Sequence, residues 1–260
     1  MQQFLELDNL TAFGLVWLRM AGCISFNPIL GRKNIPAMVQ AGMSIALALL
    51  VYTYSDVAMT VGVIDSTIEL IIVGLKELFV GFTIGFVVSL FSYIIILGGE
   101  VMDMQMGLAM SKVYDPGSNV SMSLSSTLYN VLFIFTFFIT EGHITLFKLF
   151  LDLEKVVPYG EVIFNNGDVA QHIIMIFCHC TVLGLKLAMP MLALQFLMEM
   201  AVGVLMKNIP QINVLMINIQ IKIFIGFIFM VVIFSPIMAF TEDIIEKMFE
   251  SIVEISKLLG

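Results

Sequence analysis

Charged residues are the scarcest class in this 260-residue chain. Only 12% of its residues are Asp, Glu, Lys or Arg, whereas 60% are hydrophobic and the mean hydropathy is +1.03. Soluble domains typically carry about 25% charged residues, so the composition excludes an ordinary soluble domain and predicts an integral membrane protein. The net charge of −8 argues against nucleic acid as a ligand, and no basic cluster marks an anionic-lipid site.

Cysteine is also rare. The chain has three cysteines, and so small and odd a number does not indicate a disulfide framework. Two of them flank a histidine in the run Cys178-His179-Cys180. Adjacent residues of a helix point in different directions, and a fourth ligand at tetrahedral spacing is missing. We therefore interpret the run as packed helix residues rather than as a metal site.

The usual signatures of catalysis are missing as well. Serines cluster at Ser121, Ser123, Ser125 and Ser126, but no histidine lies near them in sequence and no glycine elbow precedes them. No phosphate-binding loop or dinucleotide fingerprint is present. We predict that the protein is not an enzyme and that it binds no cofactor or metal. An intramembrane enzyme is the weakest alternative.

Long hydrophobic runs are what the chain has in abundance. We expect no cleavable signal peptide ahead of them, because the first nine residues carry Glu6 and Asp8 and no positive segment. A membrane-spanning helix needs about 20 mostly apolar residues, and turn signals separate six candidate runs. They are residues 11–27, 37–54, 68–97, 124–140, 173–206 and 223–240. The sequence predicts an all-α integral membrane protein with about six long hydrophobic helices.

The orientation follows from lysine and arginine in the short loops. The first loop carries Arg32 and Lys33, the third carries Lys112, and the fifth carries Lys207, whereas the second carries neither residue type. This pattern predicts loops one, three and five on the cytoplasmic side. Residues 141–171 are expected to form a longer outer loop.

Two of the runs are too long for a simple span. Residues 173–206 would form a helix of about 51 Å and residues 68–97 one of about 45 Å, against a hydrocarbon core of about 30 Å. Such helices must tilt, kink at a residue such as Pro190, or leave the bilayer into other protein. The last possibility indicates a subunit of a larger helical assembly.

Charges within the hydrophobic runs are few, and in membranes such residues usually face protein or water. They are Arg19, Lys76, Glu77, Lys186 and Glu199. They could act as the relay of a secondary transporter, but we favour pairing between helices or subunits. Lys186 and Glu199 lie about 20 Å apart along one helix and cannot pair within it. Transporters often carry internal repeats, and the sequence shows no convincing one.

Small and flexible residues indicate close packing. Gly74, Gly81 and Gly85 fall on one helical face, and the last two form a small-xxx-small motif that lets another helix approach closely. Methionines are numerous, and four of them gather in one stretch: Met102, Met104, Met106 and Met110. Methionine fills irregular gaps, so this group is either core filler or a deformable seal beside a pore.

The segment that follows, residues 107–126, is too polar to cross lipid and too apolar for a solvated linker. Asp115-Pro116-Gly117 is a strong turn signal within it. Irregular backbone at membrane depth is tolerated only inside protein or beside a cavity. The pattern fits a loop that plugs a passage.

Three blocks together carry a resemblance to one family. They are RMAGCISFNPILGRKNIPAMVQAG at 19–42, GEVMDMQMGLAMSKVYDPGSNVS at 99–121 with Glu141-Gly142-His143 after it, and GLKLAMPMLALQFLMEMAVGVLMKNIPQINV at 184–214. In this order they resemble the FliR family of export-gate subunits in flagellar type III secretion, whose virulence counterpart is SctT.

The resemblance implies a function, partners and a location. Members of this family assemble with FliP and FliQ subunits into a conical gate through which unfolded proteins are exported, with FlhB and FlhA at its cytoplasmic side. It implies the cytoplasmic (inner) membrane of a bacterium, within the flagellar basal body, and contact with lipid but not nucleic acid. It also implies two parts: 1–171, FliP-like with a plug loop at 107–123, and 172–260, a FliQ-like helical hairpin with its tip at 207–214 and an amphipathic C-terminal tail.

The resemblance also assigns two groups of site residues. The channel plug would comprise Gly107, Lys112, Tyr114, Asp115, Pro116 and Gly117. The cytoplasmic collar would comprise Lys207, Asn208, Ile209, Pro210, Gln211 and Asn213. Two positions depart from the family pattern: Ile221 precedes Lys222 where the family often has glycine or proline, and Glu199 stands where it more often has aspartate.

Overall fold

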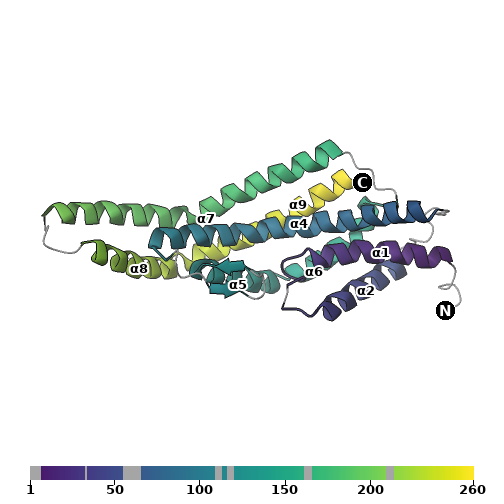
Figure 1. Cartoon of the computed structure of the whole chain (residues 1–260), viewed down its shortest axis with the longest axis horizontal. Coiled ribbons are helices and arrows are strands. Elements are labelled where there is room, and N and C mark those ends of the chain that lie inside the picture. Colours follow the sequence, from purple (N-terminus) through teal and green to yellow (C-terminus); the bar gives the residue numbers. More distant parts are fainter. Residues whose placement is uncertain are drawn as a thin grey trace. The chain divides into compact units, whose positions relative to one another are not determined.

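The computed structural model describes residues 7–32, 34–54, 66–108, 113–115, 120–160, 166–208 and 214–260. Helices dominate this part of the chain (Figure 1). They are α1 (Leu7–Ser25), α2 (Ala37–Tyr54), α4 (Thr67–Met106), α5 (Leu124–Ile139), α6 (Gly142–Val156), α7 (Asn166–Asn208), α8 (Val214–Val232) and α9 (Phe234–Leu259). Two short strands, β1 (Val113–Asp115) and β2 (Val120–Met122), stand between α4 and α5.

The predicted all-α membrane fold is confirmed, with fewer clear spans than the six hydrophobic runs. Among the described residues, α2, α4 and α7 are each long and apolar enough to cross a membrane. The number rises to five if α5 with α6 and α8 with α9 each form one bent span. Helix α1, which contains the charged Arg19, is not among them.

Helix α4 extends beyond its predicted end. The sequence predicts a turn at Gly98 and Gly99, but the helix continues through both to Met106. Both glycines lie where other helices come close: a Cβ at Gly99 would be 2.5 Å from the Cα of Ser126, and one at Gly98 would be 2.7 Å from the side chain of Leu187. These glycines therefore serve close packing, a role that sequence does not separate from a turn signal.

The loop predicted over residues 141–171 is wrong, because this stretch contains helix α6 and the beginning of α7, whereas its place on the outer side of the membrane stays a prediction. Leu146, Phe150 and Leu153 lie four and three residues apart in α6, and all three are buried. This spacing is that of an amphipathic helix. The charged residues Lys148, Asp152 and Lys155, between and after them, lie on the exposed face.

The last helical stretch also differs from the predicted run at residues 223–240. Helix α8 begins earlier, at Val214, and a break at Ile233 separates it from α9, which is bent by 62° from it. Pro236 explains the break, because a proline ring clashes with the carbonyl four residues earlier, here that of Val232, and donates no hydrogen bond to it.

The chain forms two compact units, which we describe separately. Unit 1 comprises Met1–Leu90, Glu141–Phe177 and Glu246–Gly260, and unit 2 comprises Phe91–Thr140 and Cys178–Ile245. Helices α4, α7 and α9 contribute residues to both. The division at residue 171 that the family resemblance implies concerns likeness to other subunits, and it stays a prediction.

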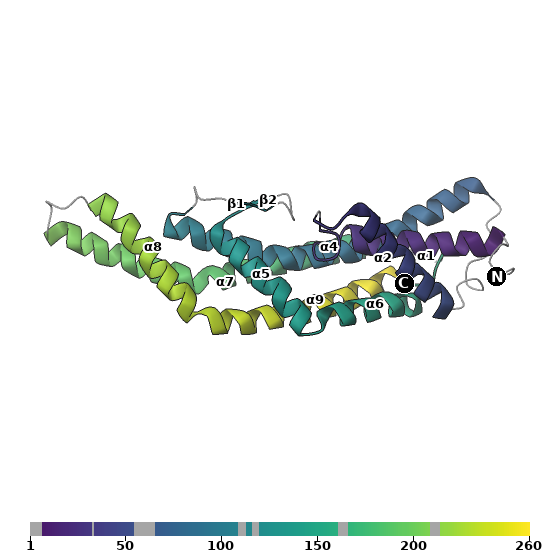
Figure 2. The same cartoon turned by 90° about the horizontal axis from the view of Figure 1, so that it is seen from below.

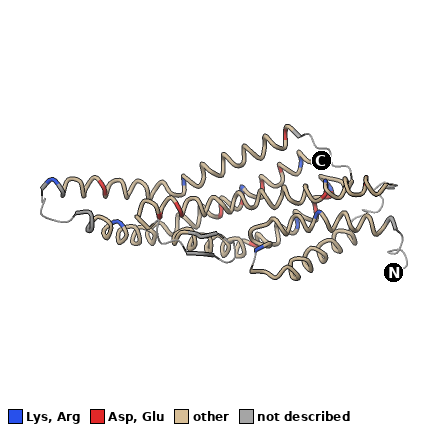
Figure 3. Tube along the Cα trace, viewed as in Figure 1, with Lys and Arg blue, Asp and Glu red and all other residues tan. Residues whose placement is uncertain are grey.

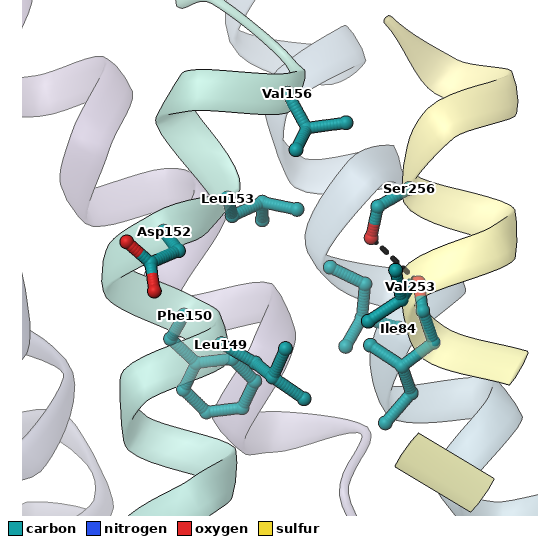
Figure 4. A pocket seen from close by; sticks show the side chains of 9 residues that line it. Ile84, Leu149, Phe150, Asp152, Leu153, Val156, Val253 and Ser256 are labelled. Carbon is teal, nitrogen blue, oxygen red and sulfur yellow. Dashed lines mark hydrogen bonds between the residues drawn. The ribbon is translucent and has the colours of Figure 1, made fainter. Parts of the chain in front are cut away.

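In unit 1, α1 packs beside α2 (Figures 1 and 2). The indole N–H of Trp17 donates to the Ser44 hydroxyl at 3.0 Å. An apolar cavity of about 50 Å³ lies between α4, α6 and α9. Figure 4 shows Leu153 of α6 directed toward Val253 and Ser256 of α9. The Ser256 hydroxyl is already satisfied by the carbonyl of Ile252 at 2.6 Å. The cavity is therefore a gap in apolar packing.

Candidate functional site

The candidate site is the segment from Gly107 to Ser123 in unit 2, which joins α4 to α5. Gly107 ends α4 with a φ of +80°, a left-handed conformation that glycine adopts without strain. The N–H of Leu108 donates to the carbonyl of Asp103 at 2.9 Å, and that of Gly107 to the carbonyl of Met104 at 3.3 Å. This pair of bonds is a Schellman motif, so the point where the chain leaves the helix is well defined.

A buried aspartate joins the two ends of this segment. Asp103 is fully buried in the last turn of α4. Its carboxylate accepts hydrogen bonds from the backbone N–H of Ser125, at 2.9 Å, and from the Ser125 hydroxyl. The first N–H groups of a helix have no partner within it, and the helix dipole favours a negative charge there. The carboxylate of α4 therefore caps α5 and holds both ends of the segment together.

Neighbouring serines add to this junction. The Ser123 hydroxyl makes no capping bond to α5, because it pairs with the Ser126 hydroxyl at 2.8 Å. The Ser126 hydroxyl also donates to the carbonyl of Ile96 in α4 at 2.8 Å. Together with Gly99, which lets the backbones approach, these buried hydroxyls tie the beginning of α5 to the side of α4.

Within the segment, β1 and β2 pair in antiparallel register (Figure 2). Tyr114 lies opposite Ser121, and Asp115 lies opposite Val120. The predicted turn after Asp115 therefore falls between paired strands. The remaining plug candidates Lys112, Pro116 and Gly117 lie outside the described residues.

The methionines of the predicted seal differ in burial: two are buried in the packing and one is exposed. Met102 and Met106 are fully buried in α4, and a Cβ at Gly226 of α8 would lie 2.8 Å from the Cγ of Met106. These two residues fill space between helices. Met104 points elsewhere and is 67% exposed, so it remains the candidate for a seal. Met110 is outside the described residues.

The predicted collar lies between two helices that pair in unit 2. Helix α7 ends at Asn208, one residue after the exposed Lys207, and α8 begins at Val214. The other collar candidates Ile209, Pro210, Gln211 and Asn213 are not among the described residues.

Polar contacts join α7 to α8 below this tip. Lys222 forms an ion pair with Glu199, and the Gln195 amide donates to the carbonyl of Lys222 at 3.1 Å. These polar contacts fix the register of α7 against α8.

In unit 1, Arg19 of α1 and Glu77 of α4 form a fully buried ion pair, with Nε donating to Oε2 at 2.5 Å. Arg19 also donates to the carbonyl of Val157 at 2.7 Å, and Glu77 accepts the N–H of Gly160 at 2.9 Å. The guanidinium lies 3.8 Å from the ring centre of Tyr159, and burial raises the pKa of that phenol above its ordinary value. The pair joins two helices to the turn after α6.

The three packing glycines lie along the same contact. A Cβ at Gly81 would be 2.8 Å from the backbone nitrogen of Cys23, and one at Gly85 would be 2.9 Å from the backbone of Phe26. Gly74 is looser, because its Cβ would meet only leucine side chains of α1, the nearer one at 3.0 Å. Helix α1 therefore approaches α4 most closely near the buried ion pair.

The remaining charges within the long helices are few and lie along different helices, as Figure 3 shows for the described residues. Lys76 is partly buried and has an interaction partner. Lys186 is exposed on α7. The structure therefore brings Arg19 to Glu77 and Glu199 to Lys222, and Lys186 belongs to neither pair.

Two important residues escape the sequence analysis. Asp103 lies among methionines beyond the predicted end of the hydrophobic run at 68–97, and because α4 continues through it, its carboxylate is a buried charge near a serine-rich helix start. An acidic residue followed by a serine cluster is a usable signal for such a cap. Tyr159 has no comparable signal, because its place beside Arg19 depends on folding of residues far apart in sequence.

The described part of the chain contains no group of three or more His, Cys, Asp or Glu that could hold a metal ion. Cys178 is exposed and Cys180 is buried, so they lie on different sides of α7. The segment from Gly107 to Ser123 thus leaves one helix end and enters another, and the Asp103 carboxylate holds these two ends together.

Comparisons with known proteins agree with the family resemblance. A family described as bacterial export proteins, family 1, matches residues 10–248. The flagellar biosynthetic protein FliR of Bacillus subtilis (strain 168) is 23% identical over 256 residues, covering 98% of each chain. That of Escherichia coli (strain K12) is 25% identical over 257 residues, covering 98% of this chain and 95% of its own. The surface presentation of antigens protein SpaR of Shigella flexneri is 23% identical over 228 residues, covering 87% of this chain and 86% of its own.

Proposed function

Because this chain belongs to the bacterial export proteins, family 1, we propose that it is a membrane subunit of a bacterial type III export apparatus, similar in kind to FliR. The observation that carries the proposal is likeness along the whole chain: the family covers residues 10–248, and both FliR relatives align with 98% of the sequence. The long apolar helices support a place in the membrane. For a flagellar system this is the bacterial inner membrane.

The role is structural and gating rather than catalytic. The chain assembles with FliP-like and FliQ-like subunits, and FlhB-like and FlhA-like proteins meet it at the cytoplasmic side. Exported proteins pass through the channel that the subunits enclose. A subunit of this kind needs helices that pack on neighbours, and the exposed apolar surfaces of α2, α4 and α7 support that.

The segment from Gly107 to Ser123 closes the channel at rest and moves aside during export. The Asp103 clamp and the Schellman motif hold its two ends while the strand pair between them has few residues. A segment fixed at its ends can be displaced without unfolding α4 or α5.

A secondary transporter is less well supported by the charges that it would use. Glu77 accepts hydrogen bonds from Arg19 and Gly160, and Glu199 is engaged by Lys222. These arrangements join helices. They leave neither carboxylate free to couple an ion.

Affinity purification tests membership of the complex. A tagged chain extracted in mild detergent should be recovered with FliP-like and FliQ-like proteins in fixed proportion. Recovery of the chain alone, with export unaffected by deleting its gene, would sink the proposal.

Shortening the segment tests the gating role. A variant that lacks residues 113–120 keeps Asp103 and Ser125, so the complex should still form, but the membrane should leak ions and small solutes. Ser118→Ala, which preserves the length of the segment, is the control and should stay tight. If the shortened protein assembles, exports and keeps the membrane tight, the segment is an ordinary connector.

A further inference from the structure

Helix α7 presents an exposed stripe that no other described part of the chain covers. Its centre follows two columns of residues at seven-residue spacing, which a helix of 3.6 residues per turn keeps on one face. The columns are Val182, Met189, Phe196 and Gly203, and Lys186, Ala193, Met200 and Lys207, all of them exposed. The four large apolar side chains are between 49% and 61% exposed.

The shape of this stripe suits a helix as its partner. Seven-residue spacing lets two helices stay in contact over several turns, with side chains of one entering gaps of the other. Ala193 and Gly203 make such gaps, and nothing lies within 4 Å of a Cβ placed on Gly203. Small residues are the ones that allow helix backbones to approach closely in membranes.

The charge of Lys186 indicates what chemistry the partner helix needs, because Lys186 lies in the apolar part of α7. Between Asp168 and Lys186 lie 17 uncharged residues, or about 25 Å of helix, and between Lys186 and Glu199 lie 12. Any stretch of α7 within 169–208 that crosses a hydrocarbon core of about 30 Å therefore includes Lys186 or Glu199.

Glu199 already has Lys222, but within the described residues no carboxylate lies within ion-pair distance of Lys186. An ammonium group on an apolar helix face in a membrane normally pairs with another protein group.

We propose that the stripe on α7 from Val182 to Lys207 docks an apolar helix of a second protein, and that this helix carries a carboxylate facing Lys186. The proposal rests on the proposed function, since it names the chemistry by which a neighbouring subunit recognises this one. The chain uses the same chemistry internally, in the pairs Arg19 with Glu77 and Lys222 with Glu199.

A second copy of this chain does not fit the stripe. Two copies inserted in the same orientation about a twofold axis would bring Lys186 of one beside Lys186 of the other. Lys207 would likewise meet Lys207, and like charges at such a contact repel each other. The stripe itself carries cations but no acidic residue.

A carbodiimide that enters membranes, dicyclohexylcarbodiimide, tests the contact in the intact complex. It activates a carboxylate, and the neutral amine of Lys186 then attacks the activated carbonyl carbon to form an amide. The carboxylate oxygen and two protons leave with the reagent as its urea. Mass spectrometry of the crosslinked peptides identifies both residues. We expect Lys186 joined to an Asp or Glu within an apolar helix of another subunit.

Two substitutions separate charge from reactivity. Lys186→Arg keeps the positive charge but forms no amide with this reagent, so the complex should be recovered normally while the crosslink disappears. Lys186→Met leaves the partner's carboxylate unpaired, and recovery of the complex should fall about tenfold or more. On the stripe, Ala193→Trp should also reduce recovery, whereas Ala201→Trp, exposed beside the stripe on the same helix, should not.

Other results would overturn the inference. Full recovery of the complex with Lys186→Met, together with no crosslink in the wild type, would mean that Lys186 reaches lipid headgroups instead. A crosslink between two copies of this chain would mean that the stripe is a self-association surface. In either case co-purification of the wild-type complex would still stand, so failure of this inference differs from failure of the proposed function, in which the wild-type chain is recovered alone.

Discussion

At the scale of single residues, buried charges hold this protein together. Arg19 and Glu77 have no exposed surface, and between them they bind three backbone groups after α6 as well as each other. A buried pair of this kind contributes little compared with apolar residues of the same size, but removal of one partner is severe because the other charge is left unpaired. Asp103 is also a buried carboxylate, but its partners are the neutral N–H and hydroxyl of Ser125 in the first turn of α5, so it acts as a cap rather than as half of an ion pair.

Arg19→Met should lower the free energy of unfolding by about 3–5 kcal/mol, because Glu77 would remain buried without its counter-ion. The double variant Arg19→Met with Glu77→Leu should recover part of that loss, although the backbone groups after α6 stay unsatisfied. Thermal unfolding of the purified protein in detergent measures both. Lys155→Met, which removes an exposed ion pair with Asp152, is the control and should change little. Equal stability of the single and double variants would contradict the prediction.

Asp103→Ala should loosen the start of α5. The N–H of Ser125 would lose its acceptor and the helix its capping charge, a loss of about 1–2 kcal/mol. Amide hydrogen exchange over residues 124–128 should therefore become faster. Gln105→Ala, at the same end of α4, is the matched control. Unchanged exchange in the Asp103 variant would show that the serine contacts to α4 hold the junction without the carboxylate.

At the scale of helices, the crossing of α1 and α4 depends on glycine. The Cβ that a larger residue would add at Gly81 has no room, because backbone atoms of α1 stand in its place and backbone cannot rotate away as a side chain can. The same holds where Gly99 meets the start of α5. Close approach of this kind brings Arg19 within reach of Glu77.

Gly81→Ala should destabilise the protein by about 1–3 kcal/mol through overpacking, which forces the two backbones apart. Gly42→Ala is the matched control, because Gly42 also lies inside a helix but has nothing within 4 Å of an added Cβ. There alanine should be neutral or stabilise by up to about 1 kcal/mol through its higher helix propensity. Thermal unfolding in detergent compares the two. A Gly81→Ala protein as stable as the wild type would mean that α1 can shift without loss.

At the scale of the whole molecule, the orientation in the membrane connects the hairpin of α7 and α8 to its expected partners. The collar candidates follow Lys207, and the lysines and arginines of the first, third and fifth loops predict the cytoplasmic side for this end. If the proposed function is right, an FlhB-like protein lies against it.

A cysteine introduced as Asn208→Cys should react with a membrane-impermeant thiol reagent only from the cytoplasmic side, and should crosslink to an FlhB-like protein. The background must lack the native cysteines, since Cys178 is exposed. Thr67→Cys, at the beginning of α4 after the second loop, is the control and should react only from the outer side. Labelling of the Asn208 variant from the outer side alone would contradict both the orientation and the collar assignment.

Composition and pattern by themselves determine the class of this protein and most of its helices. Residues so apolar must form helices in a membrane, because a helix satisfies its own backbone hydrogen bonds there. The run at 37–54 coincides with α2, and the run beginning at 124 agrees with α5 almost to its end. The family resemblance is likewise a property of the sequence, carried by residues whose spacing is visible without a structure.

Only the tertiary structure decided what individual residues do, because their roles depend on neighbours distant in sequence. Glycine can form a turn or allow close packing, and the sequence does not distinguish these roles at Gly98 and Gly99. The structure does, because Leu187 and Ser126 of other helices lie against them. Asp103 became a cap when the beginning of α5 folded beside the end of α4. Arg19 pairs with Glu77, which lies 58 positions later in the chain. No periodic pattern in the sequence predicts a contact between residues so far apart.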